Sequence, residues 1–91
     1  MTVRVRVWIS GQVQGVGFRW AVEDEARVKG VTGWVKNLPD GRVEAVFEGD
    51  EGAVQQMIEF CRHGPTLARV DDVQVVREEY IGELEGFSIR R

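Results

Sequence analysis

Residues 11–19 read Gly-Gln-Val-Gln-Gly-Val-Gly-Phe-Arg and connect an alternating apolar run to a charged segment with helical periodicity. Three glycines in seven positions let such a strand-to-helix connection turn sharply and approach a ligand without Cβ clashes. Successive N–H groups of the turn can form a concave anion site, which the positive end of the following helix strengthens. Arg19 adds a full charge and a planar set of donors that matches phosphate geometry. The stretch therefore predicts a phosphate cradle made by the backbone of Gln14, Gly15, Val16, Gly17, Phe18 and Arg19.

The cradle differs from two other phosphate-binding loops. A P-loop would place Lys-Ser or Lys-Thr after its last glycine, whereas Phe18 and Arg19 follow Gly17 here. A cysteine phosphatase loop would place a thiol six residues before the arginine, and that position is Val13. The loop therefore holds no nucleophile, and any chemistry on a bound phosphoryl group must use water directly.

The flanking residues predict a strand and a helix. Before the cradle, a period-two pattern predicts a strand whose buried face carries Val3, Val5, Val7 and Ile9. After the cradle, apolar residues at i+4 spacing predict an amphipathic helix that reaches about Lys29 and ends at Gly30. The apolar face of this helix carries Phe18, Val22 and Ala26.

The middle of the chain predicts a hairpin and a second helix. Strands are expected over 31–38 and 42–48, and Leu38-Pro39-Asp40-Gly41 between them is a typical tight turn. Asp50 is a favourable N-cap for the following helix, which ends before His63-Gly64-Pro65. The apolar face of this helix carries Val54, Met57, Ile58 and Cys61.

Two further strands, over 69–79 and 87–90, complete the predicted fold. The order is βαββαβ with a short extra C-terminal strand, which predicts an α+β, ferredoxin-like α/β sandwich. Two helices should cover one face of an antiparallel sheet, and residues 1–91 should form a single domain. This fold hosts many functions, so the function has to be argued from the site.

Composition excludes several classes of protein. The net charge of −3 argues against a nucleic-acid surface, and no apolar run approaches the ~20 residues that span a membrane. One cysteine allows no internal disulfide, and the N-terminus does not have the pattern of a signal peptide, so we expect a cytoplasmic protein. With one histidine and one cysteine, the usual soft ligands cannot assemble a metal cluster.

Several motifs resemble those of the acylphosphatases. The first is Gly11-x-Val13-Gln14-Gly15-Val16-x-Phe18-Arg19. The second is Gly33-Trp34-Val35-Lys36-Asn37, followed by Asp40-Gly41-x-Val43-Glu44. The resemblance continues through Gly64-Pro65, Ala68-Arg69-Val70 and Gly86-Phe87-x-Ile89-Arg90, so it spans nearly the whole chain.

This resemblance implies hydrolysis of the carboxyl–phosphate bond of an acyl phosphate to carboxylate and inorganic phosphate, without metal or cofactor. It also implies that Arg19 and Asn37 are the catalytic residues. The sparse residue set suits that substrate, because the carboxylate leaving group has a conjugate acid of pKa about 4 and departs without a general acid. The implied partner is a small-molecule substrate, with no nucleic acid or membrane, and a monomer is favoured.

Other interpretations compete with these assignments. Arg19 could pair with Glu23 at i+4, although a cation at a helix N-terminus opposes the dipole, and Asn37 could be an ordinary residue before a turn. Asp71-Asp72 and Glu78-Glu79 are interpreted as solvated strand ends. The three tryptophans are interpreted as packing residues rather than as side chains on which RNA bases stack; they are Trp8, Trp20 and Trp34.

Two other functions remain as alternatives. The first is a non-catalytic anion-binding module, since acylphosphatase-like domains also occur within larger hydrogenase-maturation proteins. This chain ends at Arg91 without the partner domains of those proteins, so we expect a stand-alone enzyme. The second is RNA binding on the open face of the sheet, which the acidic charge balance disfavours.

Overall fold

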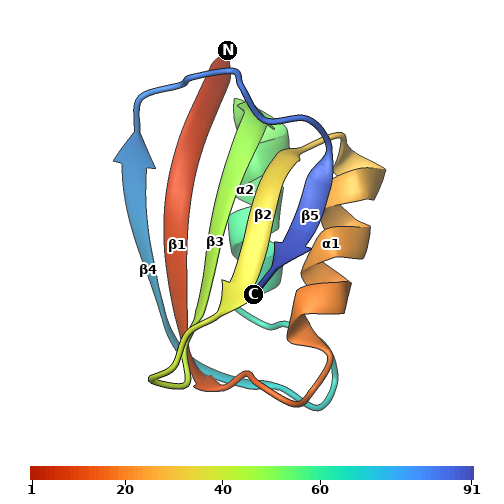
Figure 1. Ribbon diagram of the computed structural model, residues 1–91, viewed down its shortest axis with the longest axis vertical. Coiled ribbons are helices and arrows are strands. Elements are labelled where there is room, and N and C mark those ends of the chain that lie inside the picture. The colour runs from red at the N-terminus through yellow and green to blue at the C-terminus, as the bar shows by residue number, and fades with distance from the viewer.

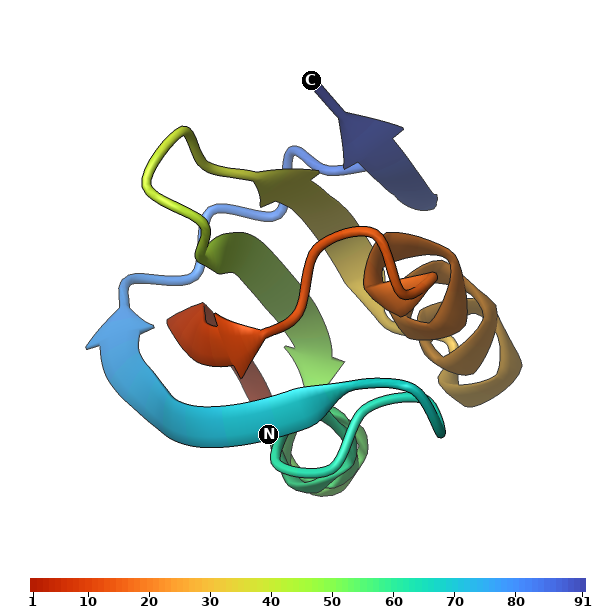
Figure 2. The same cartoon turned by 90° about the horizontal axis from the view of Figure 1, so that it is seen from below.

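The computed structural model describes residues 1–91 as five strands and two helices. In chain order these are β1 (Thr2–Gln12), α1 (Phe18–Lys29), β2 (Thr32–Asn37), β3 (Val43–Asp50), α2 (Glu51–Cys61), β4 (Arg69–Glu78) and β5 (Phe87–Arg90). The strands form one sheet in the order β4-β1-β3-β2-β5, and both helices lie against one of its faces (Figure 1, Figure 2). The predicted ferredoxin-like sandwich is confirmed, and every predicted element is present.

One edge of the sheet differs from the predicted antiparallel arrangement. β5 runs parallel to β2, with Gly33 opposite Phe87 and Val35 opposite Ile89. The segment 79–86 leaves the end of β4 and crosses the same end of the sheet to its far edge, so β5 runs opposite to β4 (Figure 1). Since β2 also runs opposite to β4, β5 takes the direction of β2 and the sheet is mixed.

The hydrophobic core lies between the sheet and the two helices. The predicted buried face of β1 is confirmed, because its four apolar side chains are all at most 5 % exposed: Val3, Val5, Val7 and Ile9. The predicted apolar faces of the helices are confirmed as well; their buried residues are Phe18, Val22, Ala26, Val54, Met57, Ile58 and Cys61. Because both helices lie on this one face, no helix covers the other face of the sheet (Figure 2).

The predicted helix ends are also observed. Gly30 follows α1 with a left-handed backbone (φ 70°), and its N–H bonds back to the carbonyl of Arg27 at 3.3 Å. Asp50 precedes α2, and its carboxylate accepts a hydrogen bond from the N–H of Gly52 at 3.1 Å. Neither helix has the length and apolar character needed to cross a membrane.

Gly11, the first glycine of the predicted cradle motif, belongs to β1 rather than to the loop. The pairing of β1 with β4 shifts register between Ser10 and Gly11. Gly11 has a φ of 129°, and a Cβ atom there would lie 2.1 Å from the carbonyl oxygen of Arg69. The close approach of β4 therefore requires this glycine.

The open face of the sheet carries a network of ion pairs. Arg4 bonds to Glu48 at 3.2 Å and to Glu78 at 3.0 Å. Arg6 bonds to Glu44 at 3.0 Å and to Glu78 at 2.8 Å. The interpretation of Glu78 as a solvated strand end is therefore wrong, because this carboxylate joins two arginines of the neighbouring strand. That contact depends on the pairing of β4 with β1, which local sequence does not reveal.

Three cations surround Trp34 on the same face. The guanidinium of Arg6, the ammonium of Lys36 and the guanidinium of Arg90 lie 5.4, 5.4 and 4.8 Å from its ring centre. Trp34 is 6 % exposed, which agrees with the packing interpretation. The basic side chains of this face are thus paired with carboxylates or lie over the indole ring of Trp34.

Two glutamates of the network have lowered pKa values. Burial by itself would raise the pKa of Glu48, but hydrogen bonds from the two N–H groups of residues 81–82 and from Arg4 outweigh it and lower the pKa. Hydrogen bonds from Arg6 and then from Arg4 lower the pKa of Glu78. Both carboxylates are therefore stabilised in their charged form by the native fold.

We predict that Glu78→Gln lowers the free energy of unfolding at neutral pH by ~1 kcal/mol or less, because its ion pairs are partly exposed. The folded-state pKa of Glu78 lies below its unfolded value of about 4.3, so the wild-type advantage is fully present above that pH and is lost as the pH falls through the folded-state pKa. Urea unfolding of both proteins from neutral pH to about pH 3 measures the difference. Glu79→Gln, at the exposed neighbour, is the matched control. A Glu78→Gln deficit that stays constant across this range would contradict the role of the carboxylate.

Candidate active site

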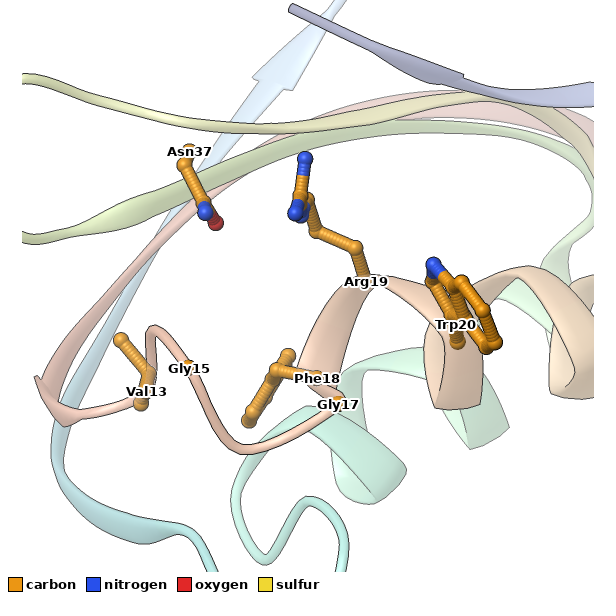
Figure 3. A pocket seen from close by; sticks show the side chains of 7 residues that line it. All are labelled: Val13, Gly15, Gly17, Phe18, Arg19, Trp20 and Asn37. Carbon is orange, nitrogen blue, oxygen red and sulfur yellow. The ribbon is translucent and has the colours of Figure 1, made fainter.

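A pocket of about 320 Å³ opens where the loop between β1 and α1 faces the end of β2. The loop, the first turn of α1 and the last residue of β2 contribute its lining, which is Val13, Gly15, Gly17, Phe18, Arg19, Trp20 and Asn37 (Figure 3). The fold thus brings together two segments that are separate in the sequence.

The loop needs glycine at two positions because of its backbone conformation. Gly15 and Gly17 have φ angles of 75° and 79°, in the region that residues with side chains rarely adopt. A Cβ atom at either position would meet no other atom within 4 Å, so the requirement is conformational rather than steric crowding. The two left-handed residues turn the chain from β1 into α1 within a few residues.

This turn leaves a row of N–H groups without acceptors in the protein. Gly17 is the N-cap of α1, and no side chain caps the helix. The first N–H of the helix with a protein acceptor is that of Ala21, which bonds to the carbonyl of Gly17 at 3.0 Å. The N–H groups of residues 15–20 make no hydrogen bond within the protein. Such donors at the positive end of a helix form the kind of concavity that binds anions.

The side chain of Gln14 ties the loop to the hairpin between β2 and β3. Its Nε2 atom donates to the carbonyl oxygen of Leu38 at 2.8 Å and to that of Arg42 at 3.0 Å. The sequence predicts a place for Gln14 in the cradle through its backbone, whereas this side-chain contact joins segments that are distant in the sequence. The two hydrogen bonds hold the loop next to the end of β2, which carries Asn37.

Arg19 projects from the first turn of α1 into the pocket (Figure 3). Its alternative partner, Glu23, instead accepts a hydrogen bond from Arg27 at 3.1 Å, so the interpretation of an Arg19–Glu23 pair is wrong. No carboxylate of the protein forms an ion pair with Arg19, and the first turn of α1 contains no acidic residue. The guanidinium is therefore a half-buried cation without a protein counter-charge at an unfavourable end of a helix.

Asn37 directs its amide into the same pocket, toward the guanidinium of Arg19 (Figure 3). Its Oδ1 atom is buried and has no hydrogen-bond partner. The hairpin turn is held by other groups: the N–H of Leu38 bonds to Arg42, and the side chain of Asp40 bonds to Arg42 as well. The side chain of Asn37 thus makes no hydrogen bond of the turn, and its unpartnered acceptor calls for a ligand.

The predicted cradle and the pocket overlap in part. Gly15, Gly17, Phe18, Arg19 and Asn37 line the pocket, whereas the predicted residues Gln14 and Val16 do not. Two lining residues, Val13 and Trp20, were not among the predicted site residues. Trp20 is 71 % exposed, so its interpretation as structural packing is wrong. Its position directly after Arg19 was the one signal in the sequence that could have placed it at the site.

The pocket contains no group suited to acid–base or nucleophilic chemistry. No carboxylate, imidazole or thiol is among its lining residues. Cys61 is fully buried elsewhere, and burial raises the pKa of its thiol to about 12, which keeps it protonated. The structure has no group of three or more His, Cys, Asp or Glu side chains arranged to hold a metal ion.

Fold and site together define a small ferredoxin-like sandwich in which an arginine from the first turn of α1 and an amide from the end of β2 line one pocket beside a strand-to-helix loop. The Acylphosphatase family model matches residues 5–89. An acylphosphatase of Rubrobacter xylanophilus is 54 % identical over 89 residues, which cover 98 % of this chain and 81 % of that relative. The crystal structure of acylphosphatase from Bacillus subtilis has a TM-score of 0.94 and 39 % identity, covering 98 % of this chain and 99 % of that one. The chain belongs to the acylphosphatase family, whose members are hydrolases that act on acid anhydrides.

The same domain also resembles part of a longer protein. Full-length HypF, in its phosphate- and nucleotide-bound form, matches all of this chain over 12 % of its own length, with a TM-score of 0.87 and 28 % identity. Folds of this kind thus occur both as short chains and within larger ones.

We predict that Gln14→Ala weakens the site as well as the fold. Loss of two hydrogen bonds to backbone carbonyls should lower the free energy of unfolding by about 1–2 kcal/mol. Because the same bonds hold the loop against the hairpin, the inhibition constant for inorganic phosphate should rise as well. Thermal unfolding and phosphate inhibition of turnover measure the two effects, with Gln12→Ala, at an exposed glutamine of the same segment, as control. Unaltered phosphate inhibition in Gln14→Ala would show that these two hydrogen bonds do not shape the loop for its ligand.

Proposed function

We propose that this acylphosphatase cleaves an acyl phosphate by direct attack of water at phosphorus, with Arg19 binding the phosphoryl group and Asn37 holding the water. The products are a carboxylate and inorganic phosphate, and the reaction uses neither metal nor cofactor. The observation that carries the proposal is the meeting of an unpaired guanidinium and a buried, unpartnered amide oxygen in one pocket.

The phosphoryl group binds in the turn between β1 and α1. The N–H groups of residues 15–19 donate to its oxygens, and the end of α1 adds a favourable dipole. The guanidinium of Arg19 makes a bidentate contact with two phosphoryl oxygens. Negative charge on these oxygens is stabilised by donors that are already in place, so little reorganisation is needed in the transition state.

Asn37 orients the attacking water. Its Oδ1 atom accepts an O–H of the water, which directs a lone pair of the water oxygen toward phosphorus. A new P–O bond forms as the bond from phosphorus to the acyl oxygen breaks, and the carboxylate departs with the bonding electron pair. The proton of the water passes to a phosphoryl oxygen of the substrate, so the pocket needs no general base.

The chemistry of the leaving group explains why so few residues suffice. A carboxylate, with a conjugate acid of pKa about 4, leaves at neutral pH without protonation. An alkoxide from an ordinary phosphate ester would need a general acid, and the pocket lining contains none. The residue set thus suits acyl phosphates and disfavours phosphate monoesters.

We also propose that residues 1–91 act as a single acylphosphatase domain, as a monomer in the cytoplasm and without a nucleic-acid partner. The lone, buried Cys61 supports the monomer, since it offers no exposed thiol for a disulfide between copies. Size-exclusion chromatography tests the monomer, and an RNA titration at varied salt tests the absence of a nucleic-acid partner.

A turnover assay with benzoyl phosphate tests the proposed function against a non-catalytic anion-binding module. We expect hydrolysis to survive exhaustive chelation and to be inhibited competitively by inorganic phosphate. Phenyl phosphate, whose phenolate leaving group has a conjugate acid of pKa about 10, is the comparison substrate and should be hydrolysed far more slowly. Phosphate binding without turnover of benzoyl phosphate would favour the binding module. Loss of activity on chelation, restored by one metal, would refute the metal-free reaction.

We predict that Arg19→Ala abolishes phosphate binding and lowers kcat/KM by a factor on the order of a hundred to a thousand, while the fold remains intact. Arg19→Lys should recover little activity, because an ammonium cannot reproduce the bidentate contact. Arg27→Ala, at an exposed arginine of the same helix whose guanidinium contacts Glu23, is the matched control and should retain normal kcat/KM. Near-normal catalysis by Arg19→Lys would refute the bidentate role.

We predict that Asn37→Ala lowers kcat and kcat/KM together, on the order of a hundredfold, and leaves KM nearly unchanged. Its stability should change little, because the Oδ1 atom that is lost has no partner in the protein. Asp40→Ala, which removes the side chain that holds the turn, should show the reverse pattern, with a lower melting temperature and normal kcat. Melting temperature, phosphate affinity and kcat are measured on the same samples. An Asn37→Ala protein with lowered stability and normal kcat would make Asn37 a turn residue only.

A further inference from the structure

We propose that Trp20 binds the acyl group of the substrate and gives this enzyme a preference for flat, apolar acyl phosphates such as aromatic ones. This inference rests on the proposed function of the pocket. Trp20 follows Arg19 in the first turn of α1 and lines the same pocket, yet it is 71 % exposed (Figure 3). A large indole ring is thus presented to solvent at the mouth of a site for a phosphorylated molecule.

The direction of the reaction places the acyl group on the side of Trp20. In-line displacement requires the leaving oxygen to depart opposite to the attacking water. In the view of Figure 3, Asn37, which holds the water, lies to one side of Arg19 and Trp20 lies to the other. With the phosphoryl group bound at Arg19, the carboxylate and the group attached to it extend away from Asn37 and toward the indole.

Trp20 is the one apolar side chain of the pocket that is exposed and can contact a ligand. Val13 and Phe18 are 1 % and 2 % exposed, and their side chains are part of the hydrophobic core. The three cation–π contacts of the structure all involve Trp34, so no protein cation covers the ring of Trp20. The indole face can therefore stack on a planar apolar group of the substrate.

The surroundings of Trp20 favour a small ligand over a protein partner. The other exposed apolar residue of α1 is Val28, eight positions further along the helix. Asp24 lies between them on the same side of the helix and is exposed. The two residues thus form no continuous apolar stripe of the kind that a partner helix requires.

The experiment compares kcat/KM for benzoyl phosphate with kcat/KM for acetyl phosphate in the wild type, Trp20→Ala and Trp20→Phe. Both substrates share the phosphoryl group and differ in the acyl group, so the change in this ratio between wild type and variant reports on the acyl contact. We expect Trp20→Ala to lower the benzoyl-to-acetyl ratio by about three- to tenfold and Trp20→Phe to keep most of it. Val28→Ala truncates the other exposed apolar residue of the same helix and should leave the ratio unchanged.

Binding without turnover gives a second measurement. Calorimetric titration with benzylphosphonate and methylphosphonate should show the same loss of preference in Trp20→Ala. If the wild type hydrolyses both substrates, and Trp20→Ala changes neither the kcat/KM ratio of the substrates nor the affinity ratio of the phosphonates, the acyl-binding role is overturned while the proposed function stands. If the wild type hydrolyses neither substrate, the proposed function fails, and the phosphonate titration still decides whether Trp20 contacts the organic group.

Discussion

Burial of one face of β1 is the constraint on which the rest of the structure depends. This strand pairs with β3 on one side and with β4 on the other, and its alternate side chains supply the centre of the core. A shift of one residue in register would move Arg4 and Arg6 into the core, where unpaired charges are costly. The register is therefore strongly determined, and with it the point where the chain leaves the sheet. The loop with Gly15 and Gly17 begins at that point and turns directly into α1.

The site is assembled from two segments that share no local structure. The loop supplies backbone N–H groups and Arg19, and the end of β2 supplies Asn37. The side chain of Gln14 joins them through two carbonyl oxygens of the hairpin. The polar groups of this site come mainly from the backbone, which suits the proposed electrostatic stabilisation and positioning rather than proton transfer by side chains.

Arg19 also stands apart from most arginines of the chain in its electrostatic surroundings. Seven others form ion pairs with carboxylates: Arg4, Arg6, Arg27, Arg42, Arg62, Arg69 and Arg77. Arg19 has no such partner and lies at the helix end where the dipole disfavours a cation. A local arrangement that disfavours stability is expected where a site must receive an anion. The unpaired amide oxygen of Asn37 is a second such feature at the same place.

The sequence by itself determined the elements, the helix ends and the buried faces of β1 and both helices. It also singled out Arg19 and Asn37, which the fold brings into one pocket. These features follow from periodicity, from cap and turn residues and from family motifs, all of which are written in neighbouring residues. Only the tertiary structure decided that β5 runs parallel to β2, that Glu78 joins Arg4 and Arg6, and that Trp20 lies exposed at the pocket. Each of these depends on which groups meet across strands or at the end of a helix, and such contacts arise only when distant segments pack together.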